Sequence, residues 1–389
     1  SSRVGGDGVM AKLGEICAFQ SGGTPSKNKP EYFGGEIPWI STTALNGGKI
    51  NEADAVAWIT PKAIRESAAK IVPANSIMVG TRVGIGKVAI NTVEMSTSQD
   101  VISLIGIDKD KWYKPYLCKL LLSKKDYFNS QARGATIKGI KIDVVANIDV
   151  PEIDYATQRK VAATLNKIDT LIVLRKQQLE KLDELIKARF VEMFGDPVKN
   201  TMDWEIKPLS ELGELNRGVS KARPRNSPEL LGGPYPLIQT GEVANAKTYI
   251  TSFNSTYSEK GLAQSKMWPK GTLCITIAAN IAQTSILTFD ACFPDSVVGF
   301  ISRNMTNELF IHYWFSFFQK ILDEQAPQVA QKNINLKILS ELNVIVPPLS
   351  LQNRFAAFVE RVDQQKQTIQ QSLEKLELMK KALMQEYFG

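Results

Sequence analysis

At 389 residues the chain is too long for one ordinary domain, and its 43% apolar residues can fill more than one core, so we expect at least two globular units. This composition excludes a disordered protein, and four cysteines without a CxxC pair argue against a disulfide framework or a zinc site. The cysteine usage indicates a reducing compartment, with the cytoplasm as the default. A net charge of +7 fits nucleic-acid binding, but many proteins without a polyanionic partner share it.

Residues 1–11 (SSRVGGDGVMA) lack the apolar stretch of a signal peptide, so we expect a leader or a cloning remnant there and a fold that starts near Lys12. The most apolar run of the chain, Leu309 to Phe318, is about half the length that spans a bilayer. No membrane segment is predicted.

Residues 12–150 have the pattern of a first globular domain. Pro73, in IVPANSIMVGT, precedes an apolar run rich in β-branched residues, which is typical of a buried strand. Tyr116, Leu117, Leu120 and Leu121 recur at the spacing of a helix with one face in a core. Strands and a helix in one unit predict a mixed α/β (α+β) fold.

Residues 151–196 predict a long helix, because apolar residues recur three and four positions apart, with Arg175 at one step of the series. From Thr157 to Phe194 such a helix is about 55 Å long, which is the length of a spacer. Its seam, the face expected to pack on a second helix, consists of Leu165, Ile168, Ile172, Arg175, Leu179, Leu182 and Ile186.

Residues 197–346 repeat the first domain at an offset of about 196 positions. LGEICAFQSG at Leu13 is matched by LGELNRG at Leu212, and IPWIST at Ile37 is matched by YPLIQT at Tyr235. Pro269 again leads an apolar run. The residues at helical spacing in this half are Phe310, Trp314, Phe317, Phe318 and Ile321.

Residues 347–389 carry a second heptad series, so a partner for the first helix lies in the same chain. We expect an antiparallel coiled coil with a domain at each end and an approximate two-fold axis, because the chain must leave one domain and return to it. At an offset of 194, Ile172 corresponds to Lys366 and Arg175 to Ile369, a mismatch that can fix the register. The alternative is that each helix lies on its own domain. The second seam is Val359, Val362, Lys366, Ile369, Leu373, Leu376 and Leu383.

No catalytic motif is apparent. GIGKVA at Gly84 fits GxGxxA, but no good helix and no suitably placed acidic residue follow, so a turn between strands explains it better than a dinucleotide site. Walker and amino-methyltransferase motifs are absent, and no acidic-x-Lys follows Pro294-Asp295 as a nuclease would need. His312, the one histidine, is predicted to be a packed core residue, which argues against histidine-based catalysis or a metal site.

The segment SGGTPSKNKPEYFGGEIPWISTTAL, together with VPPLSLQNRFAAFVERVD leading into a helix that ends in EYFG, resembles the specificity (S) subunit of type I restriction-modification systems. The resemblance covers nearly the whole chain and includes the duplicated order of variable domain and helical spacer. It implies two target-recognition domains that each read one half of a bipartite double-stranded DNA target. It also implies that the helices set the gap between the half-sites and dock two methyltransferase (M) subunits, with restriction (R) subunits joining through the complex.

Sequence-specific DNA binding needs phosphate contacts for position and polar side chains that reach base edges, and glycine-rich loops supply both. In the first domain the candidates are Thr24, Ser26, Lys27 and Lys29 in GGTPSKNK, Ser41, Thr42 and Thr43 after Trp39, Thr81, Arg82 and Lys87 around GTRVGIGK, and Ser98, Gln99, Arg133, Thr136 and Lys138. By the repeat, the second domain offers Arg217, Lys221, Arg223 and Arg225, then Gln239 and Thr240, then Asn280 and Gln283, and then Gln331, Lys332 and Asn333. Its GVSKARPR loop departs from the GGTPS version of the first half, as two different half-sites would require.

The chain is therefore expected to be a non-catalytic DNA-recognition subunit. No cofactor is expected in it, because S-adenosylmethionine, ATP and Mg²⁺ would belong to the partner subunits. Two alternatives stay open: the recognition module of a type IIB-like restriction enzyme, and a bivalent protein-binding scaffold without a DNA role.

Overall fold

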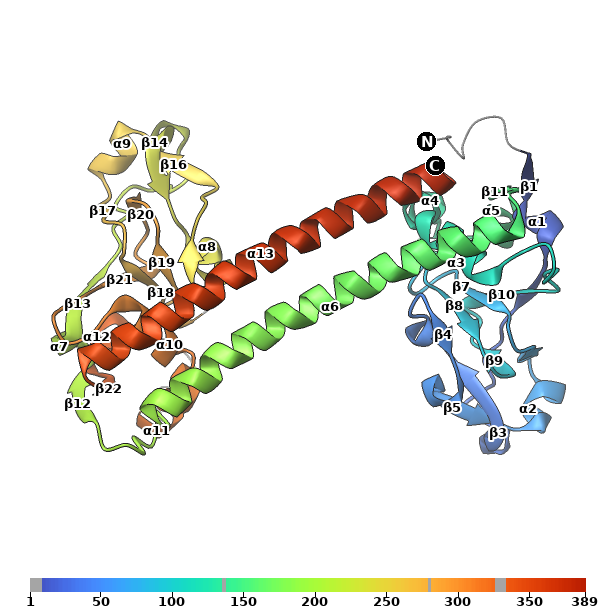
Figure 1. Cartoon of the computed structure of the whole chain (residues 1–389), viewed down its shortest axis with the longest axis horizontal. Coiled ribbons are helices and arrows are strands. Elements are labelled where there is room, and N and C mark those ends of the chain that lie inside the picture. The colour runs from blue at the N-terminus through green and yellow to red at the C-terminus, as the bar shows by residue number, and fades with distance from the viewer. Residues whose placement is uncertain (1–8, 135–137, 279–280, 326–333) are drawn as a thin grey trace. The chain divides into compact units, whose positions relative to one another are not determined.

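The computed structural model describes residues 9–134, 138–278, 281–325 and 334–389 (Figure 1). The chain forms two compact units, one made of the residues up to Lys176 together with Gln371–Gly389, and the other made of Gln177–Gln370. The boundaries fall inside two long helices, so each unit contains one globular domain and a segment of both helices.

The globular domain of the first unit is built on two sheets and one short strand pair. The larger sheet has the strand order β2-β10-β7-β8-β4 and the smaller one β5-β3-β9-β6, while β1 pairs with β11. All residues of the central strands β7 and β8 are buried, as their apolar sequences require. The strands are β1 (Met10–Lys12), β2 (Ala18–Ser21), β3 (Phe33–Ile40), β4 (Lys49–Ile50), β5 (Ala57–Ile59), β6 (Ile71–Val72), β7 (Ile77–Gly80), β8 (Val88–Asn91), β9 (Met95–Thr97), β10 (Val101–Ile105) and β11 (Asp149–Pro151).

The globular domain of the second unit repeats this plan, with strand orders β13-β21-β18-β19-β15, β16-β14-β20-β17 and β12-β22. The register repeats too, because Ser21 opposes Ile102 in the first unit and Arg217 opposes Val298 in the second. The mixed α/β class and the internal repeat predicted from the sequence are thus confirmed. The strands are β12 (Glu205–Pro208), β13 (Gly213–Arg217), β14 (Leu231–Leu237), β15 (Tyr249–Ile250), β16 (Ser255–Tyr257), β17 (Met267–Trp268), β18 (Leu273–Thr276), β19 (Thr284–Leu287), β20 (Ala291–Cys292), β21 (Val297–Ser302) and β22 (Asn343–Val346).

Strand β1 corrects the expected start of the fold. Met10 to Lys12 pair antiparallel with β11, and Ala11 is buried. Met10 and Ala11 therefore belong to the domain, although the sequence analysis placed them in a leader. The strand is held by a partner at the far end of the domain sequence, which no local pattern reveals.

Short helices cover the sheets and shape the loops. The spacing that predicted a helix around Tyr116 corresponds to α3, where Tyr116, Leu117, Leu120 and Leu121 are fully buried. The apolar stretch around Trp314 forms two helices, α10 and α11, separated by a tight turn. The helices are α1 (Leu13–Ile16), α2 (Pro61–Glu66), α3 (Lys114–Ser123), α4 (Lys125–Gln131), α5 (Ile142–Ala146), α7 (Leu209–Leu212), α8 (Thr240–Asn245), α9 (Glu259–Ala263), α10 (Glu308–Phe315), α11 (Phe318–Gln325) and α12 (Leu336–Glu341), with 3-10 turns η1 (Pro30–Tyr32), η2 (Thr42–Ala44), η3 (Glu52–Asp54) and η4 (Pro228–Leu230).

The two long helices are α6 (Tyr155–Phe194) and α13 (Leu349–Phe388). Asp154 caps α6, because its carboxylate accepts hydrogen bonds from the main-chain N and the hydroxyl of Thr157. In the first unit Leu165 lies in the core of the globular domain, and in the second unit Phe190 and Phe194 do the same. Each unit thus anchors its segment of α6 by burying apolar side chains.

Within each unit the segments of α6 and α13 run antiparallel. In the first unit Asp169 pairs with Lys380 at 2.6 Å, and Arg175 Nε donates to Ser372 Oγ at 3.3 Å. In the second unit Lys366 pairs with Asp183 at 2.6 Å. The predicted seam positions all lie on inward faces: Leu165, Ile168, Ile172, Leu179, Ile186, Val359, Val362, Lys366 and Leu373 are buried, and Arg175, Leu182, Ile369, Leu376 and Leu383 are half-buried.

Candidate nucleic-acid interface

The GGTPSKNK loop of the first domain begins where β2 ends. The main-chain N of Gly22 donates to Val101 O at 3.0 Å, and that of Gly23 donates to Thr97 O at 2.9 Å. A Cβ on Gly22 would lie 2.1 Å from the carbonyl oxygen of Ser98, so only glycine allows this close approach. The loop therefore crosses residues 97–101 with a fixed path.

The candidate loops that follow β2, β3 and β7 meet around residues 97–100, which include the candidates Ser98 and Gln99. The main-chain N of Gln99 reaches Thr24 Oγ1 at 3.5 Å, and Thr81 N donates to Asp100 O at 2.8 Å. Arg82 lies 3.9 Å from the carboxylate of Asp100. Because Ser98 N also donates to Ile40 O at 2.9 Å, the turn of residues 41–43 lies beside the same segment.

The candidates of the first domain differ in exposure. Thr42, Thr81 and Ser98 are buried, so their side chains shape the loops and do not face a ligand. Ser41 is half-buried, and its hydroxyl lies 2.8 Å from that of Thr43. The exposed candidates are Thr24, Ser26, Lys27, Lys29, Thr43, Arg82, Lys87, Gln99, Arg133 and Lys138.

Two features of this surface were missed from the sequence. A cavity of about 410 Å³ is lined by Arg82 and Arg133 and also by Lys141, which no motif singled out. Lys29 donates to the hydroxyl of Tyr32 at 2.9 Å, and this hydrogen bond raises the pKa of Lys29, so its ammonium stays charged. Lys141 reaches Arg82 only through the folding of segments distant in sequence, whereas Tyr32 lies three residues from Lys29 in the chain.

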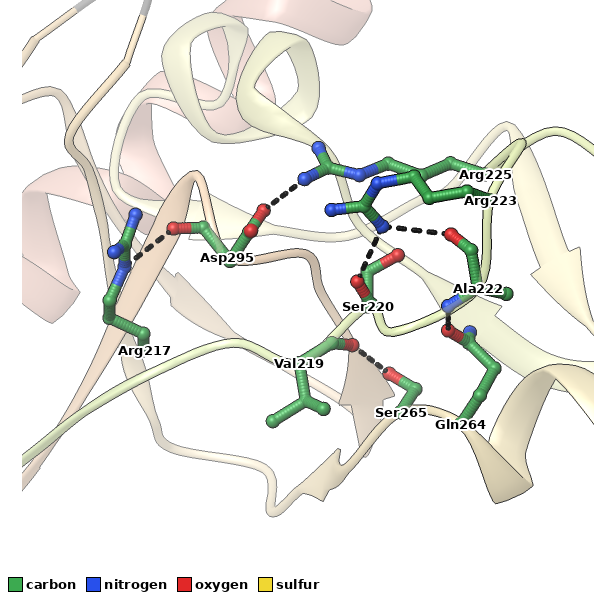
Figure 2. Close-up of polar contacts among 9 residues, drawn as sticks. All are labelled: Arg217, Val219, Ser220, Ala222, Arg223, Arg225, Gln264, Ser265 and Asp295. Atoms are coloured by element: carbon green, nitrogen blue, oxygen red, sulfur yellow. Dashed lines mark hydrogen bonds and ion pairs between the residues drawn. The ribbon is translucent and has the colours of Figure 1, made fainter.

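In the second domain, the end of β13 and the equivalent loop after it hold three arginines in defined positions (Figure 2). Arg217 Nε donates to the main-chain O of Asp295 at 2.9 Å, and Arg225 Nη2 donates to the carboxylate of Asp295 at 2.6 Å. Arg223 Nη1 donates to the carbonyls of Ser220 and Ala222, each at 2.8 Å. Arg223 therefore folds its own loop, while the other two arginines converge on Asp295.

A glutamine and a serine from the segment after α9 hold this loop from one side (Figure 2). Ser265 Oγ donates to Val219 O at 2.7 Å, and Ala222 N donates to the side-chain oxygen of Gln264 at 2.9 Å. The main-chain N of Lys221 also donates to Gln264 O at 3.3 Å, while the side chain of Lys221 is exposed. These hydrogen bonds thus hold the main chain of the loop in place.

Gln239 and Thr240, two of the candidates, lie near Arg225. They line a cavity of about 170 Å³ whose other polar residues, Ser220, Asn226, Ser255 and Ser296, were not predicted. Gln239 is also the N-cap residue of α8, and its main-chain N donates to the carboxylate of Glu242 at 3.2 Å. Pro294 and Ser296, the chain neighbours of Asp295, line the same cavity.

Gln283 lies elsewhere. It lines a cavity of about 540 Å³ together with His312, Lys247 and Lys366. His312 is half-buried at this cavity, and so it is not the fully packed core residue that the sequence predicted. Five further candidates, Thr136, Asn280, Gln331, Lys332 and Asn333, lie outside the described residues.

Among residues 9–134, 138–278, 281–325 and 334–389, no group of three or more His, Cys, Asp and Glu side chains could hold a metal ion. No helix in that part of the chain is long and apolar enough to cross a membrane.

Known proteins resemble this chain over both halves. The sequence profile of the type I restriction modification DNA specificity domain matches residues 7–184 and again residues 201–378. The specificity subunit of the type I restriction enzyme MjaIX of Methanocaldococcus jannaschii is 30% identical over 230 residues, 54% of this chain and 53% of that protein. The EcoR124I/EcoR124II specificity subunit of Escherichia coli is 29% identical over 192 residues, 45% of this chain and 46% of that protein. The chain thus spans about half the length of these curated relatives.

Two solved structures show the same fold. The S subunit of a type I restriction-modification system from M. genitalium has a TM-score of 0.59 at 16% identity, over 98% of this chain and 96% of that one. A structure from a study of complex assembly and conformational transition of the type I R-M system has a TM-score of 0.62 at 18% identity, over 98% of both chains. Since the profile matches twice and accounts for most of its length, the chain belongs to the family of type I restriction modification DNA specificity domains.

Proposed function

We propose that this chain is the DNA sequence-specificity subunit of a type I restriction-modification enzyme, in which each globular domain reads one half of a bipartite target. The observation that supports this most is the duplicated family match over two domains of one strand order. The two domains present different side chains at equivalent positions, such as Ser21 and Arg217. Two copies of one scaffold with different loop chemistry suit two different half-sites.

The long helices are proposed to set the gap between the half-sites and to dock two methyltransferase subunits. Support comes from large apolar side chains that α6 and α13 leave exposed, since such side chains on a helix favour contact with another protein. They are Tyr155, Val173, Leu174, Leu378 and Met379 in the first unit and Leu185, Val191 and Leu349 in the second. Restriction subunits would join through this complex.

Catalysis is proposed to come from the partner subunits, so the chain itself acts only in recognition. S-adenosylmethionine, ATP and Mg²⁺ would bind those partners. The exposed lysines and arginines of the loops would contact phosphates, and this makes the affinity depend on salt. A cytoplasmic location remains a prediction from the cysteine usage.

The test is a gel shift and a methylation assay with the chain co-purified with its methyltransferase subunit. We expect one bipartite sequence to be bound and methylated, with affinity falling as salt rises. Failure to bind any duplex at low salt would contradict the proposal. Stable capture of two protein partners without DNA would favour a scaffold, and cleavage at a fixed distance on both sides of the site would favour a type IIB-like enzyme.

A further inference from the structure

The cluster of Arg217, Asp295 and Arg225 in the second domain indicates which base that domain reads, an inference that rests on the proposed function. Asp295 stands between the two arginines (Figure 2): its main-chain O accepts from Arg217 at 2.9 Å and its carboxylate accepts from Arg225 at 2.6 Å. The side chains of Arg225 and Asp295 are 44% and 37% exposed, so a ligand can reach the pair. The cluster is thus held by hydrogen bonds and is still accessible to a ligand.

The chemistry of Arg225 suits one base. A guanidinium has five N–H donors in a rigid fork, and the bond to Asp295 uses Nη2, which leaves donors along the other edges of the fork. Two parallel N–H groups of this kind match the O6 and N7 acceptors of guanine in the major groove. A carboxylate behind the arginine fixes the plane of the fork before DNA arrives, which lowers the entropy lost on binding.

Arg223 does not have this role. Both of its hydrogen bonds go to main-chain carbonyls of its own loop, at Ser220 and Ala222. It stabilises the main-chain conformation of the loop that carries Arg225. The three arginines therefore divide into one that shapes the loop and two that meet at Asp295.

We propose that Arg225, oriented by Asp295, reads a guanine in the half-site of the second domain. Its surroundings suit a base edge, because Arg225 lines the same 170 Å³ cavity as Gln239, Asn226 and Ser255. These uncharged polar side chains can donate to and accept from the neighbouring base pair.

The first domain is built differently at the same place. The hydrogen bonds from Gly22 to Val101 and from Gly23 to Thr97 recur between Gly218 and Val297 and between Val219 and Phe293, which aligns Gln99 with Asp295. Ser21 takes the place of Arg217.

The loop itself also differs between the domains. It runs from Gly22 to Pro30 in the first domain and is two residues longer in the second, from Gly218 to Pro228. Of the two lysines in the shorter loop, Lys27 is exposed and Lys29 donates to the hydroxyl of Tyr32. A lysine lacks the fork of a guanidinium, so Arg225 has no equivalent in the loop of the first domain. Only one half-site should therefore depend on it.

The experiment uses the full chain co-purified with its methyltransferase subunit. A DNA library with randomised half-sites is methylated, and the methylated fraction is sequenced for the wild type and for Arg225→Gln, Arg225→Lys and Asp295→Asn. The control is Arg303→Gln, an exposed arginine beyond the opposite end of β21 from Asp295. Retained selectivity for the half-site read by the first domain shows, in the same assay, that a variant is folded.

For the wild type we expect a required G·C pair in one half-site. Arg225→Gln should lower the preference for guanine at that one position by about ten-fold to one hundred-fold, the value of one bidentate contact. Arg225→Lys should retain part of the binding but lose most of the preference, because an ammonium lacks the fork. Asp295→Asn should weaken the preference at the same position, and Arg303→Gln should leave both half-sites unchanged.

An unchanged guanine preference in Arg225→Gln, or two half-sites without a required G·C pair, would overturn the inference and leave the proposed function intact. Absence of any sequence-selective methylation by the wild-type complex would instead contradict the proposed function, and this inference with it.

Discussion

The buried lysine of the first domain, Lys119, shows how single residues tie the long helices to the sheets. Its side chain is 7% exposed, and its Nζ lies 2.7 Å from Asp169 of α6, which Lys380 of α13 also approaches at 2.6 Å. Burial acts to raise the pKa of Asp169, but the two ammonium groups outweigh it and hold this pKa below its usual range. The carboxylate of Asp169 thus pairs with both ammonium groups, and that of Lys119 is buried.

Asp169→Asn should destabilise the protein by about 2–4 kcal/mol, because it leaves the buried ammonium of Lys119 unpaired. The measurement is urea denaturation at pH 7. The matched control is Glu184→Gln, which removes the carboxylate of the exposed pair with Lys181 and should change the free energy of unfolding by less than about 0.5 kcal/mol.

The same variant has a defined pH dependence. Since the pKa of Asp169 is lowered by folding, its stabilisation is complete above the unfolded value of about 3.9 and is lost as the pH falls below it. The difference between wild type and Asp169→Asn should therefore stay constant from pH 7 to about pH 5 and shrink as the pH falls below about 3.9. A difference that is constant with pH would show that the carboxylate charge is not the cause.

His312 should give the chain its one histidine-dependent change in stability. Desolvation at its half-buried position, with a smaller contribution from Lys366, lowers the pKa of His312 to about 4, and its Nδ1 lies 2.9 Å from Thr284 Oγ1. The unfolded chain binds this proton near pH 6.5 and the folded chain does not, so stability falls as the pH falls through this window.

Between pH 6.5 and pH 5 we expect a loss of about 1–2 kcal/mol in the free energy of unfolding. His312→Gln should abolish this slope, because no other histidine is present in the chain. Thermal or urea unfolding across these pH values is the measurement. A slope that survives in the variant would have to come from another group.

At the level of elements, the end of α6 is held in the second domain by aromatic packing. Phe190 is fully buried, with ring centroids 4.9 Å from Phe194 and 5.5 Å from both Phe310 of α10 and Phe355 of α13. One side chain thus joins three helices. The next residue along, Val191, is 41% exposed.

Phe190→Ala should cost about 3–5 kcal/mol, because it opens a cavity where the surrounding rings cannot collapse. Val191→Ala, one residue away on the exposed face of the same helix, should stay within about 0.5 kcal/mol. Chemical denaturation followed by tryptophan fluorescence separates the two. Equal effects would mean that helix propensity matters more at this end of α6 than packing does.

The seam between the two helices contains a charged residue whose position, but not whose partner, could be predicted from the heptad pattern. Lys366 is buried, and it pairs with Asp183 of α6 at 2.6 Å and with Asp363 of its own helix at 3.3 Å. Burial raises the pKa of Asp363, and among the described residues its Oδ2 has no hydrogen-bond partner. The position could be predicted from spacing, but the partner depends on how the helices face each other.

At the scale of the whole molecule, the repeat and the two helices make the proposed spacer testable. Four residues inserted after Lys176 in α6 and again after Gln370 in α13, at the positions where the two units divide, keep the pairings inside each unit. The insertion lengthens each helix by about 6 Å, which corresponds to about two base pairs of DNA. We expect the tolerated gap between the half-sites to change by that amount, with the same bases read.

The measurement is methylation of DNA with a series of gaps. A single four-residue insertion in α6 alone is the control, and it should destabilise the protein because it shifts the α6 seam against α13. Altered half-site bases with an unchanged gap would contradict the spacer role.

The periodic elements could be predicted from residue order. Spacing of three and four identified both long helices and their seams, and the repeat of LGE and of the proline-led strands identified two copies of one domain. These features are local, or they are copies of local features, so they are present in the sequence whatever the chain folds into. The candidate loops could be located in the same way, because glycine and polar clusters mark loops.

Which side chains of these loops lie together, and which remain exposed, depends on contacts between residues far apart in the chain. Asp295 joins Arg217 and Arg225, Lys141 joins Arg82, and Thr42, Thr81 and Ser98 turn inward, because strands distant in sequence are brought side by side by sheet pairing. Neither the spacing nor the residue types near these positions carry that information. Hydrogen bonding across the sheets and burial in the core therefore select which polar side chains of a loop remain available to a ligand.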